Sequence, residues 1–213
     1  MEITWYGLSS FRLTERGSSS VVTDPYPDTY GYVFPRSRAD IVTISFDEPT
    51  RNEVRGPRGP FRLLTGPGEY EIGGIFVTGV ALAGARNRKA APTLNVAFKF
   101  EFDEVAVCHL GALNHIPSQS EIEALGTINV LLTPIGGEGL ITPAQAAEVV
   151  SILEPNLVVP MHYHTAASAI KLPRVATFLK EMGSGDVESA ESLKVTSSTL
   201  PEETQLVLLD PRQ

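Results

Sequence analysis

The sequence predicts an α/β fold in which two β-sheets pack together and are covered by helices. Strand patterns rich in β-branched and aromatic residues fill the first half of the chain, whereas strand and helix patterns alternate in the second half. No linker, internal repeat or low-complexity tract divides the 213 residues. We therefore expect one domain over residues 1–213, large enough to bury a substantial core.

Short strands dominate the first half of the chain. Each is bounded by a turn signal, as Val21-Val22-Thr23 is by the following Asp24-Pro25. The strands predicted in this half are residues 3–6, 11–14, 21–23 and 41–44.

The longest strand is predicted over residues 93–102, where apolar and polar residues alternate. One face should carry Leu94, Val96, Phe98, Phe100 and Phe102. The other face should carry Asn95, Lys99 and Glu101. A turn at residues 103–104 returns the chain into a hairpin partner at residues 105–108.

Helices are predicted from their capping residues. Ser118 and Glu121 form a capping-box pattern for a helix that ends near Leu125. Thr142, Pro143 and Gln145 start a second helix, which Pro155 ends. A third helix is predicted over residues 173–182, closed by Gly183. The remaining strands are predicted at residues 128–132, 157–161, 193–196 and 205–209, and residues 84–92 are predicted as a loop.

The composition limits the classes of partner. A formal net charge of −8 and an isoelectric point of about 5.0 disfavour binding to nucleic acids or anionic membranes. No secretory signal or membrane-spanning run is present, so we expect a cytoplasmic protein. The partner is expected to be a small molecule, a protein or a second copy of the chain. The notable basic residues are Arg51, Arg55, Arg58 and Arg62.

The single cysteine, Cys108, excludes an internal disulfide and a thiolate metal cluster. It lies in the apolar run of residues 105–108, which favours a buried, unreactive thiol over a nucleophile.

Six short segments of the chain follow one another in a characteristic order and spacing. They are MEITWYGLSSF (1–11), VTDP (22–25), GPGEYEIGG (66–74), CHLG (108–111), PIGG (134–137) and VPMHY (159–163). Together they resemble the metallo-β-lactamase-fold hydrolases related to L-ascorbate-6-phosphate lactonase. The resemblance covers essentially the whole chain. It implies an αββα sandwich, two mixed sheets flanked by helices.

The resemblance also implies a site for two metal ions, usually zinc or manganese, which activate water. The family's first metal signature is His-x-His-x-Asp-His, and the corresponding stretch here is residues 46–51. Phe46 stands at the first histidine and Glu48 at the second. Thr50 stands at the aspartate, and Arg51 at the last histidine.

The other family positions are also altered. Ala112 stands where the family has a bridging aspartate, and Leu8 stands where its opening motif has a histidine. The family's middle histidine aligns near residues 83–85, which contain none. His162 is the expected ligand that remains, and Asp24 is the aspartate that supports the family's site from behind the ligands.

The ligand count therefore predicts that the metal site has been lost. A catalytic zinc site needs about three protein ligands, whereas His162 and at most Glu48 remain here. Arg51 adds a positive charge that opposes a dication. We also hypothesise that Arg51 pairs with Glu48 or Asp47 in the vacated site, the alternative being that all three are ordinary loop charges.

Other reactive residues are interpreted as structural. His162 and His164 would share one face of a strand and could bind metal, although a retained histidine beside a surface histidine is favoured. His109 is expected to pack at a strand end, and His115 to be solvated. No histidine base is evident in sequence near Ser9, Ser10 and Ser45. Residues 136–139 are interpreted as a turn and not as a phosphate-binding loop.

Three functions follow from these residues. The first is a catalytically inactive homologue with a binding, scaffolding or assembly role and a vestigial cleft at His162, Glu48, Asp47, Arg51, Asp24 and His109. The second is a Zn- or Mn-dependent hydrolase of a lactone or a phosphorylated-sugar ester, with an atypical site at His162, Glu48 and Asp47. The third is a metal-free binder of a small anion, held by Arg51 and His162.

Overall fold

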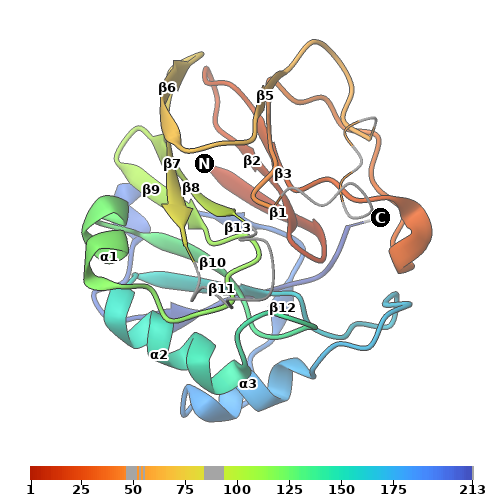
Figure 1. The fold of residues 1–213 in the computed structure, drawn as a ribbon, viewed down its shortest axis with the longest axis vertical. Coiled ribbons are helices and arrows are strands. Elements are labelled where there is room, and N and C mark those ends of the chain that lie inside the picture. Colours follow the sequence, from red (N-terminus) through yellow and green to blue (C-terminus); the bar gives the residue numbers. More distant parts are fainter. Residues whose placement is uncertain (47–51, 53, 55, 84–93, 213) are drawn as a thin grey trace.

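Two mixed sheets form the framework of the computed structural model, which describes residues 1–46, 52, 54, 56–83 and 94–212 (Figure 1). The first sheet runs in the order β13 (Leu193–Lys194), β1 (Glu2–Gly7), β2 (Ser10–Thr14), β3 (Val21–Thr23), β4 (Ile41–Thr43) and β5 (Arg62–Leu64). The second runs in the order β14 (Gln205–Leu206), β11 (Leu157–Met161), β10 (Val130–Pro134), β9 (Val105–His109), β8 (Asn95–Phe102), β7 (Ile75–Leu82) and β6 (Gly68–Ile72). A small parallel ladder joins β12 (Ser189–Ala190) to β15 (Leu208–Leu209).

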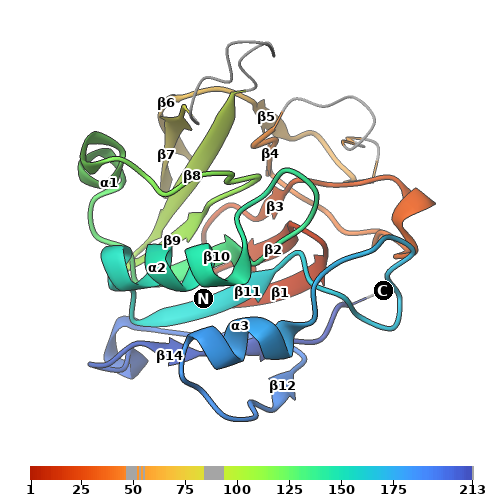
Figure 2. The same ribbon diagram turned by 60° about the horizontal axis from the view of Figure 1, so that its bottom comes forward.

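Helices lie on the side of the second sheet (Figure 2). Among the described residues they are α1 (Gln119–Leu125), α2 (Pro143–Leu153) and α3 (Val175–Glu181), with 3-10 turns η1 (Asp28–Tyr30) and η2 (Ser197–Thr199). Helix α1 contacts β7, and α2 contacts both β10 and α3. Capping boxes start α1 at Ser118 and α2 at Thr142, which confirms both predicted helix starts.

The main core fills the space between the two sheets. Large side chains from both sheets, such as Trp5, Phe11, Phe98 and Phe100, are fully buried there. Alternate residues of the first sheet, including Tyr6, Val22 and Val42, point to its other face. That face is therefore apolar as well and must be covered.

The cover of the first sheet's outer face comes from residues 24–40. Tyr26, Tyr32 and Phe34 from this segment pack with Tyr6 in a second apolar cluster. The predicted α/β sandwich is confirmed, but here a long connection carrying the single turn η1 takes the covering role that a helix was expected to fill. Aromatic side chains can do this because each buries a large apolar area.

The predicted pattern of the long strand β8 is wrong at one end. Leu94 is 45% exposed, whereas Asn95 is 4% exposed. Strand β8 begins at Asn95, and this residue pairs with Phe46, in the segment after β4, through an isolated antiparallel bridge. This pairing and the hydrogen bonds of its side chain to Leu110 and Ala112 accompany the burial of Asn95 and override the alternation. The predicted hairpin of β8 with β9 is confirmed.

Some element boundaries differ from the prediction, and three strands were not predicted. Strand β10 begins at Val130, two residues later than predicted, and α3 spans Val175–Glu181 within the predicted range. Strands β5, β6 and β7 were not predicted.

Cys108 is fully buried, as predicted, and burial raises the pKa of its thiol to about 12. Among the described residues, no helix is long and apolar enough to cross a membrane.

Candidate functional site

A cavity of about 440 Å³ lies where several parallel strands end. Its walls come from the segments that follow β3, β4, β9, β10 and β11, together with the turn between β1 and β2. This is the edge at which open α/β sheets commonly bind ligands. The lining residues are Leu8, Ser9, Asp24, Tyr26, Tyr30, Phe46, Asn52, Gly111, Ala112, Glu138, Leu140, His162, Ile170, Lys171 and Leu172.

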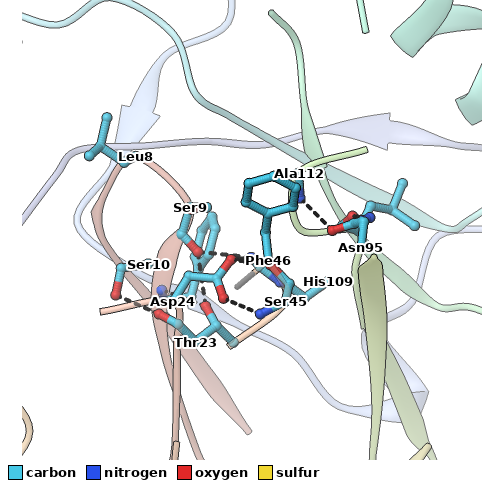
Figure 3. Close-up of polar contacts among 12 residues, drawn as sticks. Leu8, Ser9, Ser10, Thr23, Asp24, Ser45, Phe46, Asn95, His109 and Ala112 are labelled. Carbon is cyan, nitrogen blue, oxygen red and sulfur yellow. Dashed lines mark hydrogen bonds and ion pairs between the residues drawn. The ribbon is translucent and has the colours of Figure 1, made fainter. Parts of the chain in front are cut away.

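Asp24 forms part of the cavity floor and is only 8% exposed. It follows the last residue of β3, and its backbone takes a positive φ of 37°. Its Oδ1 accepts a hydrogen bond of 2.7 Å from the backbone N–H of Ser45, and its Oδ2 accepts one from the Ser45 hydroxyl (Figure 3). The carboxylate thus ties the segment after β3 to the segment after β4.

Asn95 performs the same task between β8 and the segment after β9. Its Oδ1 accepts a 2.8 Å hydrogen bond from the Ala112 N–H, and its Nδ2 donates a 2.9 Å bond to the Leu110 carbonyl (Figure 3). Gly111 lies between these two residues with φ +59°, and a Cβ there would lie 2.6 Å from Asn95 Oδ1. Only glycine fits this turn without displacing its neighbours.

His109 is completely buried behind the floor, which confirms the predicted packing role. Its Nε2–H donates a 2.8 Å hydrogen bond to the Ser9 carbonyl. Burial lowers the pKa of His109, and this effect exceeds the opposing effects of the nearby Asp24 carboxylate and the Ser9 carbonyl. The imidazole is therefore neutral near pH 7 and acts as a hydrogen-bond donor in the framework.

Three positions at which the resemblance expects metal-site residues face the cavity together. Leu8, Phe46 and Ala112 all line it, and each presents only hydrocarbon. They come from the β1–β2 turn, the segment after β4 and the segment after β9. Three positions that the motif alignment singled out therefore lie together on the wall of one cavity.

The backbone is strained at three lining residues. Leu8, Asp24 and His162 have φ values of 51°, 37° and 61°, in the left-handed region that non-glycine residues rarely adopt. For leucine this conformation costs roughly 1–2 kcal/mol. Such strain is characteristic of functional sites, because the surrounding structure must enforce it. The surrounding structure therefore enforces an unusual backbone shape at the cavity.

His162 and His164 do not share a strand face, and the favoured interpretation of His164 as a surface histidine is confirmed. Strand β11 ends at Met161, and the left-handed backbone of His162 breaks the alternation on which the prediction rested. His162 lines the cavity and its N–H donates to the Leu8 carbonyl at 3.2 Å, whereas His164 is exposed. His115 lies outside the site and contacts Glu121 at 3.3 Å, so it is not simply solvated as predicted.

The remaining predicted site residues cannot be placed. Asp47, Glu48 and Arg51, with Thr50, lie outside the described residues, as do Arg55 and residues 84–85 of the aligned middle-histidine segment. The hypothesis that Arg51 pairs with Glu48 or Asp47 stays a prediction.

The serines do not form a nucleophilic triad with His109. The histidine is a spatial neighbour that the sequence did not reveal, but it donates to a serine carbonyl and not to a hydroxyl. The Ser45 hydroxyl donates to Asp24, and the Ser10 hydroxyl to the Thr23 carbonyl at 2.7 Å. A serine–histidine nucleophile needs its hydroxyl hydrogen-bonded to the imidazole, and the hydroxyls of Ser10 and Ser45 have other partners.

Several lining residues were missed by the sequence reasoning. Tyr26 and Tyr30 come from the cover of the first sheet, and residues 170–172 from the connection before α3. Residues 136–139 form the predicted turn, but they also bring Glu138 to the cavity. The available signal was position, since all these residues lie in segments that follow parallel strands.

The donor set of the described residues does not fit a catalytic zinc or manganese site. No group of three or more His, Cys, Asp or Glu side chains with suitable geometry occurs among them. In the cavity, His162 is the family ligand that remains, while Asp24 uses both carboxylate oxygens to accept hydrogen bonds from Ser45. Hydrocarbon side chains at the family's other positions cannot donate electron pairs to a metal.

The comparisons identify the family. Residues 2–162 match the family model of the beta-lactamase superfamily domain. The chain belongs to this metallo-β-lactamase-fold family. The predicted relationship to the L-ascorbate-6-phosphate lactonase branch stays a prediction.

Individual relatives agree with this assignment. A Thermotoga maritima protein assigned to the Zn-dependent hydrolases of the metallo-β-lactamase superfamily is 32% identical, with a TM-score of 0.80 over 98% of this chain and 97% of that one. A UPF0173 protein of Pyrococcus furiosus is 27% identical over 188 residues, which cover 79% of this chain and 86% of the relative. A UPF0173 metal-dependent hydrolase of Pyrococcus horikoshii is 34% identical over 101 residues, 46% of this chain and 44% of the relative.

Proposed function

We propose that this chain is a catalytically inactive member of the family that uses its cleft to bind a small molecule. The observation that carries the proposal is the joint placement of Leu8, Phe46 and Ala112 on the cavity wall. A hydrolase of this family needs ligands there to hold metal and activate water. The wall offers apolar contact in their place.

A binding role is favoured over scaffolding because the cavity persists. Loss of a metal site need not leave a cavity, since side chains can fill it. Here about 440 Å³ stays open, within the size range of small-molecule sites. We propose further that residues 1–213 form one domain. We also propose that the protein is cytoplasmic.

The names of several relatives favour a second candidate function. Several are called metal-dependent hydrolases, so a hydrolase that uses His162, Glu48 and Asp47 is the second candidate. This rival requires metal-dependent turnover of a lactone or a phosphate ester, and the loss of that turnover when His162 is removed.

The two functions are separated by a hydrolysis assay. The full chain is incubated with Zn²⁺ or Mn²⁺ and tested on a γ-lactone and on p-nitrophenyl phosphate, beside His162→Ala and a metal-only blank. We expect the chain, the variant and the blank to give the same rate. Metal-dependent turnover that disappears in His162→Ala would overturn the proposal.

A further inference from the structure

A buried carboxyl group lies in the cavity. Asp24 is 8% exposed, lines the floor, and accepts hydrogen bonds from the neutral N–H and hydroxyl of Ser45. Hydrogen bonds orient a carboxylate, but a buried charge is stabilised chiefly by a nearby opposite charge.

The buried imidazole of His109 does not supply that charge. His109 Nε2 lies 4.0 Å from Asp24 Oδ2, but its N–H is directed to the Ser9 carbonyl. Burial lowers the pKa of His109, so the imidazole stays neutral near pH 7.

Aromatic rings line the same cavity. Tyr26, Tyr30 and Phe46 contribute to its wall. The Tyr26 hydroxyl already donates to the Tyr6 carbonyl, and burial raises its pKa, so what it offers a ligand is its ring. Aromatic faces attract cations, most strongly in sites shielded from water.

The exposed charges at the rim are of both signs. Glu138 and Lys171 line the cavity, and both are exposed. Water screens exposed charges strongly, so neither rim residue decides the charge preference of the floor.

We propose that the cavity binds an organic cation, an ammonium group on an apolar body, with the ammonium against the Asp24 carboxylate and among the rings of Tyr26, Tyr30 and Phe46. The apolar body lies along Leu8, Leu140 and Ile170. The ligand's charge takes the place of the positive charge that metal ions bring to this region in the family. This inference rests on the proposed function, since it names the ligand class of the same cavity.

The test compares three probes of similar size and shape: 2-phenylethylammonium, 2-phenylethanol and phenylacetate. Dissociation constants are measured by NMR titration of the full chain. A desolvated carboxylate should favour the ammonium over the neutral alcohol by about 10-fold or more, and phenylacetate should bind most weakly.

Two matched variants locate the charge. Asp24→Asn keeps the shape, and asparagine tolerates the positive φ, so the ammonium-to-alcohol preference should fall to about 1. Glu138→Gln removes a rim carboxylate and should leave the preference within about twofold of the original. If Asp24→Asn does not fold, the probe series on the unaltered chain decides alone.

The contrary outcomes are distinct. Equal affinities for all three probes would overturn the cation inference and leave the proposed binding role standing. Tightest binding of phenylacetate, lost in Arg51→Gln, would overturn it in favour of the anion-binding function. Absence of binding by every probe would also overturn it. Failure of the proposed function itself would appear in the hydrolysis assay, as metal-dependent turnover.

Discussion

The site has two layers that differ in their chemistry. The supporting layer is polar and hydrogen-bonded: Asp24 accepts from Ser45, Asn95 accepts from Ala112, and His109 donates to the Ser9 carbonyl. The wall in front of it is hydrocarbon at Leu8, Phe46 and Ala112. The supporting layer fixes the loops through protein hydrogen bonds, so the cleft does not need ligating side chains at these three wall positions to keep its shape. The supporting layer thus stabilises the fold, whereas the wall determines which ligands the cavity can bind.

The largest expected effect comes from the supporting layer. Gly111→Ala adds a Cβ 2.6 Å from Asn95 Oδ1 and against Ser45, at φ +59°. Strain and clash together should lower the free energy of unfolding by about 3 kcal/mol in urea denaturation. The control Gly17→Ala has φ +88° and an open surrounding, so it should lose only about 1 kcal/mol. Equal losses would show that the turn at Gly111 is not tightly packed.

A smaller loss is expected when the link between β8 and the segment after β9 is removed. Asn95→Ala leaves the Leu110 carbonyl and the Ala112 N–H without their partner. The free energy of unfolding should fall by about 2 kcal/mol. Asn95→Asp keeps the acceptor but places a buried carboxylate oxygen against the Leu110 carbonyl, so its loss should be at least as large as that of Asn95→Ala. An unchanged midpoint for Asn95→Ala would contradict the supporting role.

The buried histidine predicts a dependence of stability on pH. Burial lowers the pKa of His109 below its ordinary 6.5 in the folded protein. Just below pH 6.5, His109 therefore binds a proton in the unfolded chain but stays largely neutral in the folded protein. Stability should therefore decrease as the pH falls from about 6.5 to about 5, by at most about 1.4 kcal/mol per pH unit. His109→Gln should flatten this slope. The control His164→Gln, at an exposed position, should not, and an unaltered slope in His109→Gln would refute the assignment.

The smallest expected effect on stability belongs to the wall. Phe46→Leu exchanges one apolar side chain for another at a half-buried position, so the loss should be about 1 kcal/mol or less. The same change removes a ring from the cavity and should weaken 2-phenylethylammonium binding about threefold. 2-Phenylethanol should be affected less. A large loss of stability with unaltered binding would reverse the roles of the two layers.

The sequence predicted most of the strands that bury one or both faces, because β-branched and aromatic runs are visible there. It did not reveal β5 and β6, whose residues are largely exposed or half-buried and include Glu69 and Glu71. It also missed β7, although most of its residues are buried. It also missed the burial of Asn95, which depends on pairing with Phe46 across the two sheets. Contacts between distant segments leave no periodic pattern.

The sequence likewise predicted only part of the cavity lining. Motif order located Leu8, Phe46, Ala112, Asp24 and His162, and all five line the cavity. Tyr26, Tyr30 and Ile170 arrive through connections without periodicity, and only tertiary packing brings them to the cavity. The same-face argument for His162 and His164 was wrong because it assumed a regular strand through a left-handed residue.

Measuring the metal content of the purified protein shows whether the wall has lost its metal site. The chain is purified without a histidine tag and without chelators, and its zinc and manganese are measured by inductively coupled plasma mass spectrometry. We expect less than about 0.1 metal ion per chain, because the wall offers too few donors for tight binding. One or two zinc or manganese ions per chain, lost in His162→Ala, would contradict the account.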